Sequence, residues 1–183
     1  MTTEQKTPEV RMTIEGHICV ISLDNAAKKN AITPALMSQL STHLTTFEDD
    51  DNLWVAIMDP AGEHTTAGLD MPKFFGPSAT AKPIPKDQVN PFALHRRTTK
   101  PVISVVHGIT YTIGIEMMLA GDIVIAADTA RFCQLESKRG IAPLWPPGAP
   151  GCDPLESTQD VRPFDDRSGS SGGGTPAAGT GCQ

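Results

Sequence analysis

The sequence has few cysteines, and none of them lies in a pattern that binds a metal ion. Its four cysteines, Cys19, Cys133, Cys152 and Cys182, form no CxxC pair and have no cluster of histidines nearby. Free thiols in a reducing compartment are expected instead, since paired or clustered cysteines mark disulfide frameworks and zinc ligands. We therefore predict a cytoplasmic protein without a metal centre.

Long apolar runs and clustered positive charges are also missing. Residues 1–15 are polar and lack the apolar centre of a secretory signal. No run approaches the roughly 18 apolar residues that cross a bilayer. The net charge is -6, and the lysines and arginines form no basic stripe. We therefore expect neither a membrane nor a nucleic acid as partner.

Branched aliphatic residues become rare after Pro143. The last 40 residues, 144–183, hold eight glycines and six prolines but only three such side chains, those of Leu144, Leu155 and Val161. A segment of this composition buries too little apolar surface to offset its loss of chain entropy. We expect a flexible N-terminus at residues 1–9, one folded core at 10–143 and a disordered tail at 144–183.

Before this break, the hydrophobic pattern alternates between the periods of strands and helices. Residues 10–23 alternate around a Glu-Gly pair, which predicts a hairpin. Thr33 and Pro34 are typical of a helix start, and apolar residues at helical spacing continue to Phe47. This alternation predicts an α/β layered fold, with further strands at 53–58, 102–106 and 123–127, a surface loop at 76–91, and a helix from the turn at 108–114 to about residue 121.

The first of three segments that can carry chemistry is a glycine-bearing loop at residues 59–71. Ala67, Gly68, Leu69 and Asp70 follow a predicted strand there. Glycine permits a backbone conformation in which neighbouring N–H groups stay unpaired, and Asp70 can cap a following helix. On its own, the loop is no more than an ordinary turn from strand to helix.

The second segment contains a single acidic side chain between Lys100 and Asp122. This residue, Glu116, lies on a predicted helix whose other residues from Ile113 to Ala120 are nearly all apolar. A helix that is apolar on every side is normally buried, and a buried carboxylate is costly unless it is paired or functional. We interpret Glu116 as a buried functional carboxylate, the alternative being a glutamate on a narrow solvated stripe.

The third segment, residues 130–143, carries Glu136 after a short predicted strand. Alone, Glu136 looks like any surface glutamate. Together and in this order, the three segments resemble the crotonase family of enoyl-CoA hydratases and isomerases. AGLDM is similar to its AGxD loop, HGITYTIGIE to its glycine-rich turn before the first catalytic glutamate, and RFCQLESKRGIAP to the segment with the second. Lys29-Asn30-Ala31 resembles its N-A-[LI] signature, so the resemblance extends over most of the predicted core.

The resemblance implies a crotonase-like α/β fold, a spiral of ββα units that here lacks the family's C-terminal helical region. It implies an oxyanion hole for a thioester carbonyl, made by the backbone N–H groups of Leu69 and Ile113. Such fixed donors near a helix start suit an enolate-like oxygen. It also implies Glu116 and Glu136 as the acid/base pair of an enoyl-CoA hydratase, a lyase that adds water in syn fashion to a 2-enoyl-CoA thioester.

The resemblance also implies substrate contacts and an assembly. No cofactor is implied besides the CoA of the substrate, and the family forms homotrimers or dimers of trimers that act in fatty acid metabolism. Two lysines are candidates for the CoA phosphates, with solvated surface charges as the alternative. The positions that match substrate-binding residues are Lys28, Lys29, Ala31, Ala67, Gly68, Asp70 and Gly114.

Several features depart from the family's pattern. Thr112 and Ile113 replace small residues, and a polar context around Thr65 replaces a common phenylalanine. Because of these differences, the resemblance does not specify which acyl group the substrate carries. After Pro143 the resemblance stops, so the tail is expected to reflect a truncation or a frame shift. The alternatives are another crotonase activity, such as enoyl-CoA isomerase or acyl-CoA hydrolase, or a truncated and inactive crotonase-like product.

Overall fold

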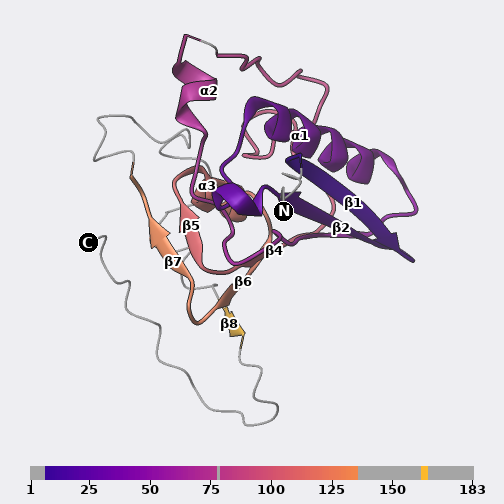
Figure 1. Cartoon of the computed structure of the whole chain (residues 1–183). Coiled ribbons are helices and arrows are strands. Elements are labelled where there is room, and N and C mark those ends of the chain that lie inside the picture. Colours follow the sequence, from indigo (N-terminus) through magenta and orange to yellow (C-terminus); the bar gives the residue numbers. More distant parts are fainter. Residues whose placement is uncertain (1–6, 78, 136–161, 165–183) are drawn as a thin grey trace, which may run out of the picture.

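The strands form two sheets. A computed structural model describes residues 7–77, 79–135 and 162–164 of the chain. Six strands lie in the order β1-β2-β3-β4-β6-β8, and β5 pairs separately with β7 (Figure 1). The predicted α/β class is therefore confirmed. In chain order the elements are β1 (Glu9–Glu15), β2 (Ile18–Asp24), the 3-10 turn η1 (Ala26–Lys28), α1 (Pro34–Asp49), β3 (Val55–Met58), α2 (Met71–Phe75), β4 (Val102–Val106), β5 (Ile109–Tyr111), α3 (Ile113–Leu119), β6 (Ile123–Ala127), β7 (Arg131–Cys133) and β8 (Arg162–Phe164).

The first two strands form the predicted hairpin. β1 and β2 pair antiparallel, with Val10 opposite Leu23 and Glu15 opposite Ile18. The turn between them passes through Gly16 at φ +59°, a conformation that glycine adopts without steric cost. All later pairs in the six-stranded sheet are parallel. Parallel neighbours need crossover connections, and α1 and α3 lie in two of these.

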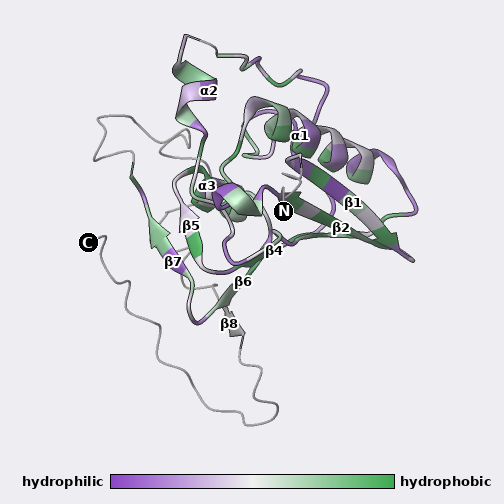
Figure 2. Ribbon diagram, in the orientation of Figure 1, coloured by the Kyte–Doolittle hydropathy of each residue, from purple (hydrophilic) through white to green (hydrophobic). Residues whose placement is uncertain are grey.

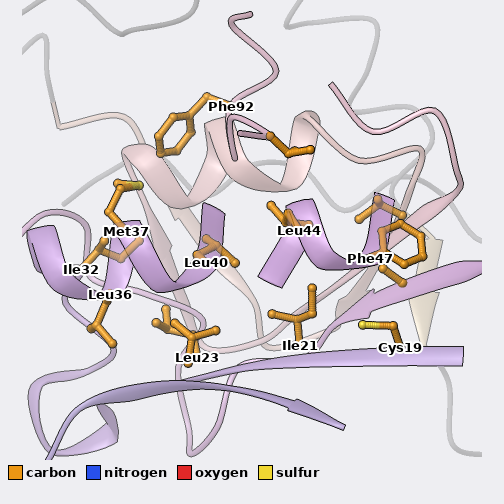
Figure 3. Close-up of a cluster of buried hydrophobic side chains, with 14 of the residues drawn as sticks. Cys19, Ile21, Leu23, Ile32, Leu36, Met37, Leu40, Leu44, Phe47 and Phe92 are labelled. Atoms are coloured by element: carbon orange, nitrogen blue, oxygen red, sulfur yellow. The ribbon is translucent and has the colours of Figure 1, made fainter. Parts of the chain in front are cut away.

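Helix α1 packs one apolar stripe against β2. The hydroxyl of Thr33 accepts a hydrogen bond of 3.2 Å from the Leu36 N–H, so the predicted helix start is confirmed. A fully buried side chain of Leu or Phe size stabilises a fold by about 1.5–3 kcal/mol. The stripe therefore holds the hairpin to the helix, through the buried side chains of Leu36, Leu40, Leu44 and Phe47 against Cys19, Ile21 and Leu23 (Figure 3).

Both α1 and α3 cover the same face of the six-stranded sheet. Cys19, Ala56 and Val102 lie across this face in register, and all three are buried in the cluster under α1. Farther along the same face, Met118 of α3 packs against Val106 of β4 and its neighbours on β6. Figure 2 shows the apolar residues of β2 and the mixed polar and apolar surface of α1. Among the described helices, none combines the length and apolarity needed to cross a bilayer.

The connection between α2 and β4 differs from the surface loop predicted for residues 76–91. Its end turns inward, and Val89 is only 1% exposed. Helix α1 satisfies the backbone there, because Ser41 Oγ donates to the Val89 carbonyl at 2.7 Å and the Val89 N–H donates to Thr45 Oγ1 at 2.9 Å. A loop can be buried where its polar backbone groups find such partners, so the prediction is wrong for this end.

Two short strands were absent from the sequence prediction. β5 lies inside the expected turn at 108–114, because the segment pairs with β7 before α3 begins. β8 lies inside the tail expected to lack structure, and it pairs parallel with β6. The other residues of the tail, like 1–6 and 136–143, lie outside the described residues, so their predicted flexibility or disorder stays a prediction.

The two described cysteines are in different chemical states. Cys133 is disulfide-bonded, which corrects the expectation of a free thiol at this position, and its partner lies outside the described residues. Cys19 is free and fully buried beneath α1. Burial raises the pKa of the Cys19 thiol to about 11, because apolar surroundings disfavour the charged thiolate.

We expect Cys19 to resist thiol reagents in the native protein. The thiolate is the reactive form, and a pKa of about 11 in place of 9.0 leaves about a hundredfold less of it at pH 8. Burial slows the reaction further until the chain opens. Iodoacetamide labelling followed by mass spectrometry, with and without denaturant, measures this. Complete modification of Cys19 within minutes in native buffer would contradict its position in the core.

Candidate active site

Segments that carry the predicted site residues lie side by side although they are far apart in the sequence. The stretch from Lys29 to Ile32 runs parallel to the loop from Ala67 to Asp70. The Ala67 N–H donates to the Lys29 carbonyl at 2.9 Å, and the Asp70 N–H donates to the Ile32 carbonyl at 2.8 Å. The N-A-I signature and the AGLD loop are therefore one hydrogen-bonded unit.

The other side of this loop is bonded to β5. The Thr66 N–H donates to the Ile109 carbonyl at 3.0 Å, and the Tyr111 N–H donates to the Thr66 carbonyl at the same distance. β5 in turn pairs with β7, and the Thr112 N–H donates to the Cys133 carbonyl at 3.0 Å. Because these neighbouring segments run parallel, the residues that follow them lie at one edge of the layer.

Two glycines permit the close approach of the AGLD loop to the start of α3. Gly68 has φ +103°, and a Cβ at this position would lie 2.5 Å from Thr112 Oγ1. A Cβ at Gly114 would lie 2.4 Å from Thr66 Cγ2. Separations this short leave no room for a side chain. The predicted substrate positions Gly68 and Gly114 therefore join the two segments of the site.

The two backbone donors predicted for an oxyanion hole lie on these joined segments. Leu69 forms a parallel bridge with Ile32. The residues on either side of Leu69 make its two hydrogen bonds, one from the Ile32 N–H to the Gly68 carbonyl and one from the Asp70 N–H to the Ile32 carbonyl. The Leu69 N–H therefore points away from Ile32. Ile113 is the first residue of α3. Within the part of the chain that the structure describes, neither N–H donates a hydrogen bond. Two such donors on adjoining segments are able to bind a developing oxyanion.

Glu116 lies one turn after Ile113 on α3 and is 3% exposed. Ile113, Gly114 and Met118 are buried on the same short helix. The predicted burial of Glu116 is confirmed, and the alternative of a solvated stripe is wrong for this residue. Because removing a carboxylate from water is costly, its place beside the backbone donors favours a chemical role, which stays a prediction.

The two lysines predicted to meet CoA lie on the surface next to the AGLD loop. Lys28 ends the 3-10 turn η1, and Lys29 follows it at φ +51°. Both are exposed, whereas Ala31 and Ala67 are half-buried. The Lys29 carbonyl accepts a hydrogen bond from the Ala67 N–H, so the backbone of Lys29 lies directly beside the predicted thioester site.

Asp70 differs from the capping residue that the sequence predicts. It occupies the position before α2, but its side chain makes no capping hydrogen bond. The carboxylate lies 3.9 Å from Lys73 Nζ in the following turn. The backbone explains the difference, because φ is -71° with ψ +81°, away from the extended backbone of a usual N-cap.

Glu136 lies outside the described residues. The structure follows the chain to Leu135, two residues beyond β7. The carbonyl of Cys133, at the end of β7, accepts the N–H of Thr112 just before α3. The chain therefore leaves β7 beside the helix that carries Glu116, while the position of Glu136 and its meeting with Glu116 stay predictions.

The side chain of Asn30 has a structural role that no local sequence pattern indicates. Asn30 is fully buried, and its Nδ2 donates to the carbonyls of Ala61 and His64, both at 2.7 Å. Its Oδ1 accepts the Asn25 N–H at 2.8 Å. The residue has φ +54°, a left-handed conformation in which Asn is enriched. Asn30 therefore ties two loops to the layer that holds the site.

Thr66 is a second buried polar residue that holds the loop. Its hydroxyl donates to the Asn30 carbonyl at 2.7 Å and accepts the Gly68 N–H at 3.0 Å. The neighbouring Thr65 bonds in the same way to the backbone of His107. The polar context around Thr65 is visible in the sequence, but the partner of Thr65 is 42 positions away and no local pattern identifies it.

Comparisons with known proteins agree on one group of enzymes. The family model described as enoyl-CoA hydratase/isomerase matches residues 13–147. A hydroxycinnamoyl-CoA hydratase-lyase of Pseudomonas fluorescens is 32% identical over 78% of this chain and 54% of its own. A carnitinyl-CoA dehydratase of Salmonella arizonae is 35% identical over 73% and 51%.

A solved structure supports the same grouping. A probable enoyl-CoA hydratase/isomerase from Mycobacterium abscessus superposes with a TM-score of 0.68 and 38% identity, over 74% of this chain and 53% of its own. The fold prediction is thus confirmed as crotonase-like. The chain spans about half the length of the curated relatives that it matches.

Proposed function

Because the chain belongs to the enoyl-CoA hydratase/isomerase family, we propose that it adds water to a 2-enoyl-CoA thioester. The observation that carries this proposal is the position of Glu116, a carboxylate only 3% exposed on the helix that starts at Ile113. The same helix thus supplies a backbone donor and a group able to transfer a proton.

The proposed oxyanion site comprises the N–H groups of Leu69 and Ile113. Attack of water on the β-carbon pushes electrons toward the thioester carbonyl, whose oxygen becomes negative in an enolate-like state. Donors fixed in advance stabilise that charge more than they stabilise the neutral carbonyl, which lowers the barrier. The contacts at Gly68 and Gly114 support this role, because they hold the two donor segments together.

The proposed proton transfers use Glu116 and Glu136. One carboxylate accepts a proton from the attacking water, whose oxygen bonds to the β-carbon. The other group of the pair delivers a proton to the α-carbon, so that one water is added in syn fashion across the double bond. Two carboxyl groups at one site can divide these roles between an acid and a base. The burial of Glu116 supports its part, and the residue match alone supports that of Glu136.

The proposed CoA site lies along Lys28, Lys29 and the AGLD loop. The exposed ammonium groups can meet the CoA phosphates, while Ala31, Ala67 and Asp70 border the thioester end. Relatives named for hydroxycinnamoyl-CoA and for carnitinyl-CoA indicate that acyl groups differ within the family. We propose no single acyl chain. Enoyl-CoA isomerase, acyl-CoA hydrolase or an inactive product are the alternatives.

Assembly and location belong to the same proposal. We propose a homotrimer or a dimer of trimers that acts in fatty acid metabolism in the cytoplasm. Light scattering after size exclusion measures the assembly. Fractionation of cells tests the location, for which the disulfide at Cys133 is an opposing observation, since disulfides are rare in reducing compartments.

The experiment that tests this function uses the full chain and three thioesters. Crotonyl-CoA tests hydration through a product heavier by one water, 3-butenoyl-CoA tests isomerisation, and butyryl-CoA tests hydrolysis through release of free CoA thiol. The proposal expects hydration of crotonyl-CoA to be the fastest of the three. Release of thiol or double-bond migration at a higher rate would replace it with one of the alternatives. Binding of crotonyl-CoA without conversion would indicate an inactive product.

A further inference from the structure

Thr112 has an unusual backbone conformation at the centre of the proposed site. It lies at φ +51° and ψ -116°, directly before the first residue of α3. Side chains rarely adopt this region, and a β-branched residue there is a genuine outlier. Such strain persists only where the surroundings enforce it, and it concentrates at functional sites.

The hydroxyl of Thr112 stands between the two segments that carry the backbone donors. A Cβ placed on Gly68 would lie 2.5 Å from Thr112 Oγ1, so this oxygen lies against the backbone of Gly68. Gly68 precedes Leu69, just as Thr112 precedes Ile113. The hydroxyl therefore belongs to the residue before one proposed donor and lies against the residue before the other.

The Thr112 hydroxyl has hydrogen-bonding capacity left for a ligand. Among the described residues, it has no hydrogen-bond partner, whereas the hydroxyls of Thr65 and Thr66 are both bonded. Thr112 is half-buried, so a ligand at the site can reach it. A hydroxyl can donate one hydrogen bond, and its O–H rotates toward the acceptor.

We propose that Thr112 Oγ1–H is a third donor to the thioester oxygen, added to the N–H groups of Leu69 and Ile113. This inference rests on the proposed function and extends it to a side chain. The bond forms as negative charge gathers on the oxygen, so it strengthens during the reaction and raises kcat more than it lowers KM. Thr112 is then a catalytic residue that a glycine at the same place cannot replace.

Three variants separate the hydroxyl from the shape of Thr112. Thr112→Val keeps the β-branched shape and removes the donor, Thr112→Ser keeps the donor, and Thr112→Gly removes both and relaxes the backbone. We expect kcat for crotonyl-CoA hydration to fall about 10- to 100-fold in the Val and Gly variants and to stay within about threefold in the Ser variant. The Gly variant is expected to melt at a higher temperature than the wild type despite its lower rate.

The deciding measurement is the carbonyl stretch of bound acetyl-CoA, by infrared difference spectroscopy with a ¹³C-labelled carbonyl. Each donor lowers this frequency, so wild type and Thr112→Ser should show a larger shift than Thr112→Val. Equal shifts and equal rates in Ser and Val variants overturn the role of Thr112 and leave the proposed function standing. Binding without any shift in the wild type, or no binding, overturns the proposed oxyanion site as well.

Discussion

Replacing Glu116 by glutamine is expected to lower kcat for hydration of crotonyl-CoA by about 10²- to 10⁴-fold. Glutamine has nearly the same shape as glutamate but can neither accept nor donate the proton that hydration moves. Glu116 is buried and follows Ile113 by one turn, so the loss falls on the chemical step. KM should change little, because the backbone donors proposed to bind the thioester remain.

The matched control for Glu116→Gln is Glu15→Gln, which makes the same change at the exposed end of strand β1. Steady-state rates with crotonyl-CoA are compared for both variants, together with melting temperatures. The control should have wild-type rates. Turnover in Glu116→Gln within a few-fold of the wild type, in a folded protein, would remove Glu116 from the proposed acid/base pair.

Replacing Asn30 by alanine is expected to destabilise the protein by about 3–5 kcal/mol. The change leaves the carbonyls of Ala61 and His64 and the N–H of Asn25 without their partner in a buried place. Alanine is also less favourable than asparagine at φ +54°. The loss is a large part of the 5–15 kcal/mol that typically stabilises a domain.

Urea denaturation followed by circular dichroism measures this loss. Asn52→Ala is the control, because Asn52 is exposed and its side chain bonds only to Asp50 among the described residues. That variant should lie within about 0.5 kcal/mol of the wild type. An Asn30→Ala protein as stable as the control would show that the hydrogen bonds of Asn30 do not hold the loops.

Elements whose signals are local could be predicted from the sequence. Thr33 and Pro34 mark the start of α1 because an N-cap hydroxyl and a proline act within one turn, and the structure shows the cap. The hairpin at β1 and β2 depends on alternation and a glycine turn, both of which are visible in the sequence. Buried Glu116 was predictable for the same reason, since its apolar neighbours lie on the same helix.

Features that depend on distant partners could not be predicted. The inward turn at Val89 requires the hydroxyls of Ser41 and Thr45 on α1, more than 40 positions away. β5 exists because β7 pairs with it, although the intervening sequence gives no sign of that pairing. A local pattern indicates the periodicity of a helix or a strand. The inward turn at Val89 and the strand β5 depend instead on hydrogen bonds to segments that are distant in the sequence.

The candidate site combines both kinds of feature. A motif resemblance placed Leu69 and Ile113, and the parallel order of the segments explains why they adjoin. No sequence pattern predicted that Thr112 takes a glycine-like conformation with its hydroxyl against Gly68. The contact between Thr112 and Gly68 becomes visible only in the three-dimensional structure.

The central claim is that backbone N–H groups of adjoining segments bind a thioester oxygen, and Ile113→Pro against Ile113→Ala tests it most directly. Proline removes the N–H at the first position of α3, where a helix tolerates it because that N–H has no helical partner. Alanine removes the same side chain and keeps the N–H. With both proteins folded, kcat/KM for crotonyl-CoA should be about 10²- to 10³-fold lower for proline than for alanine. Equal values would contradict the account.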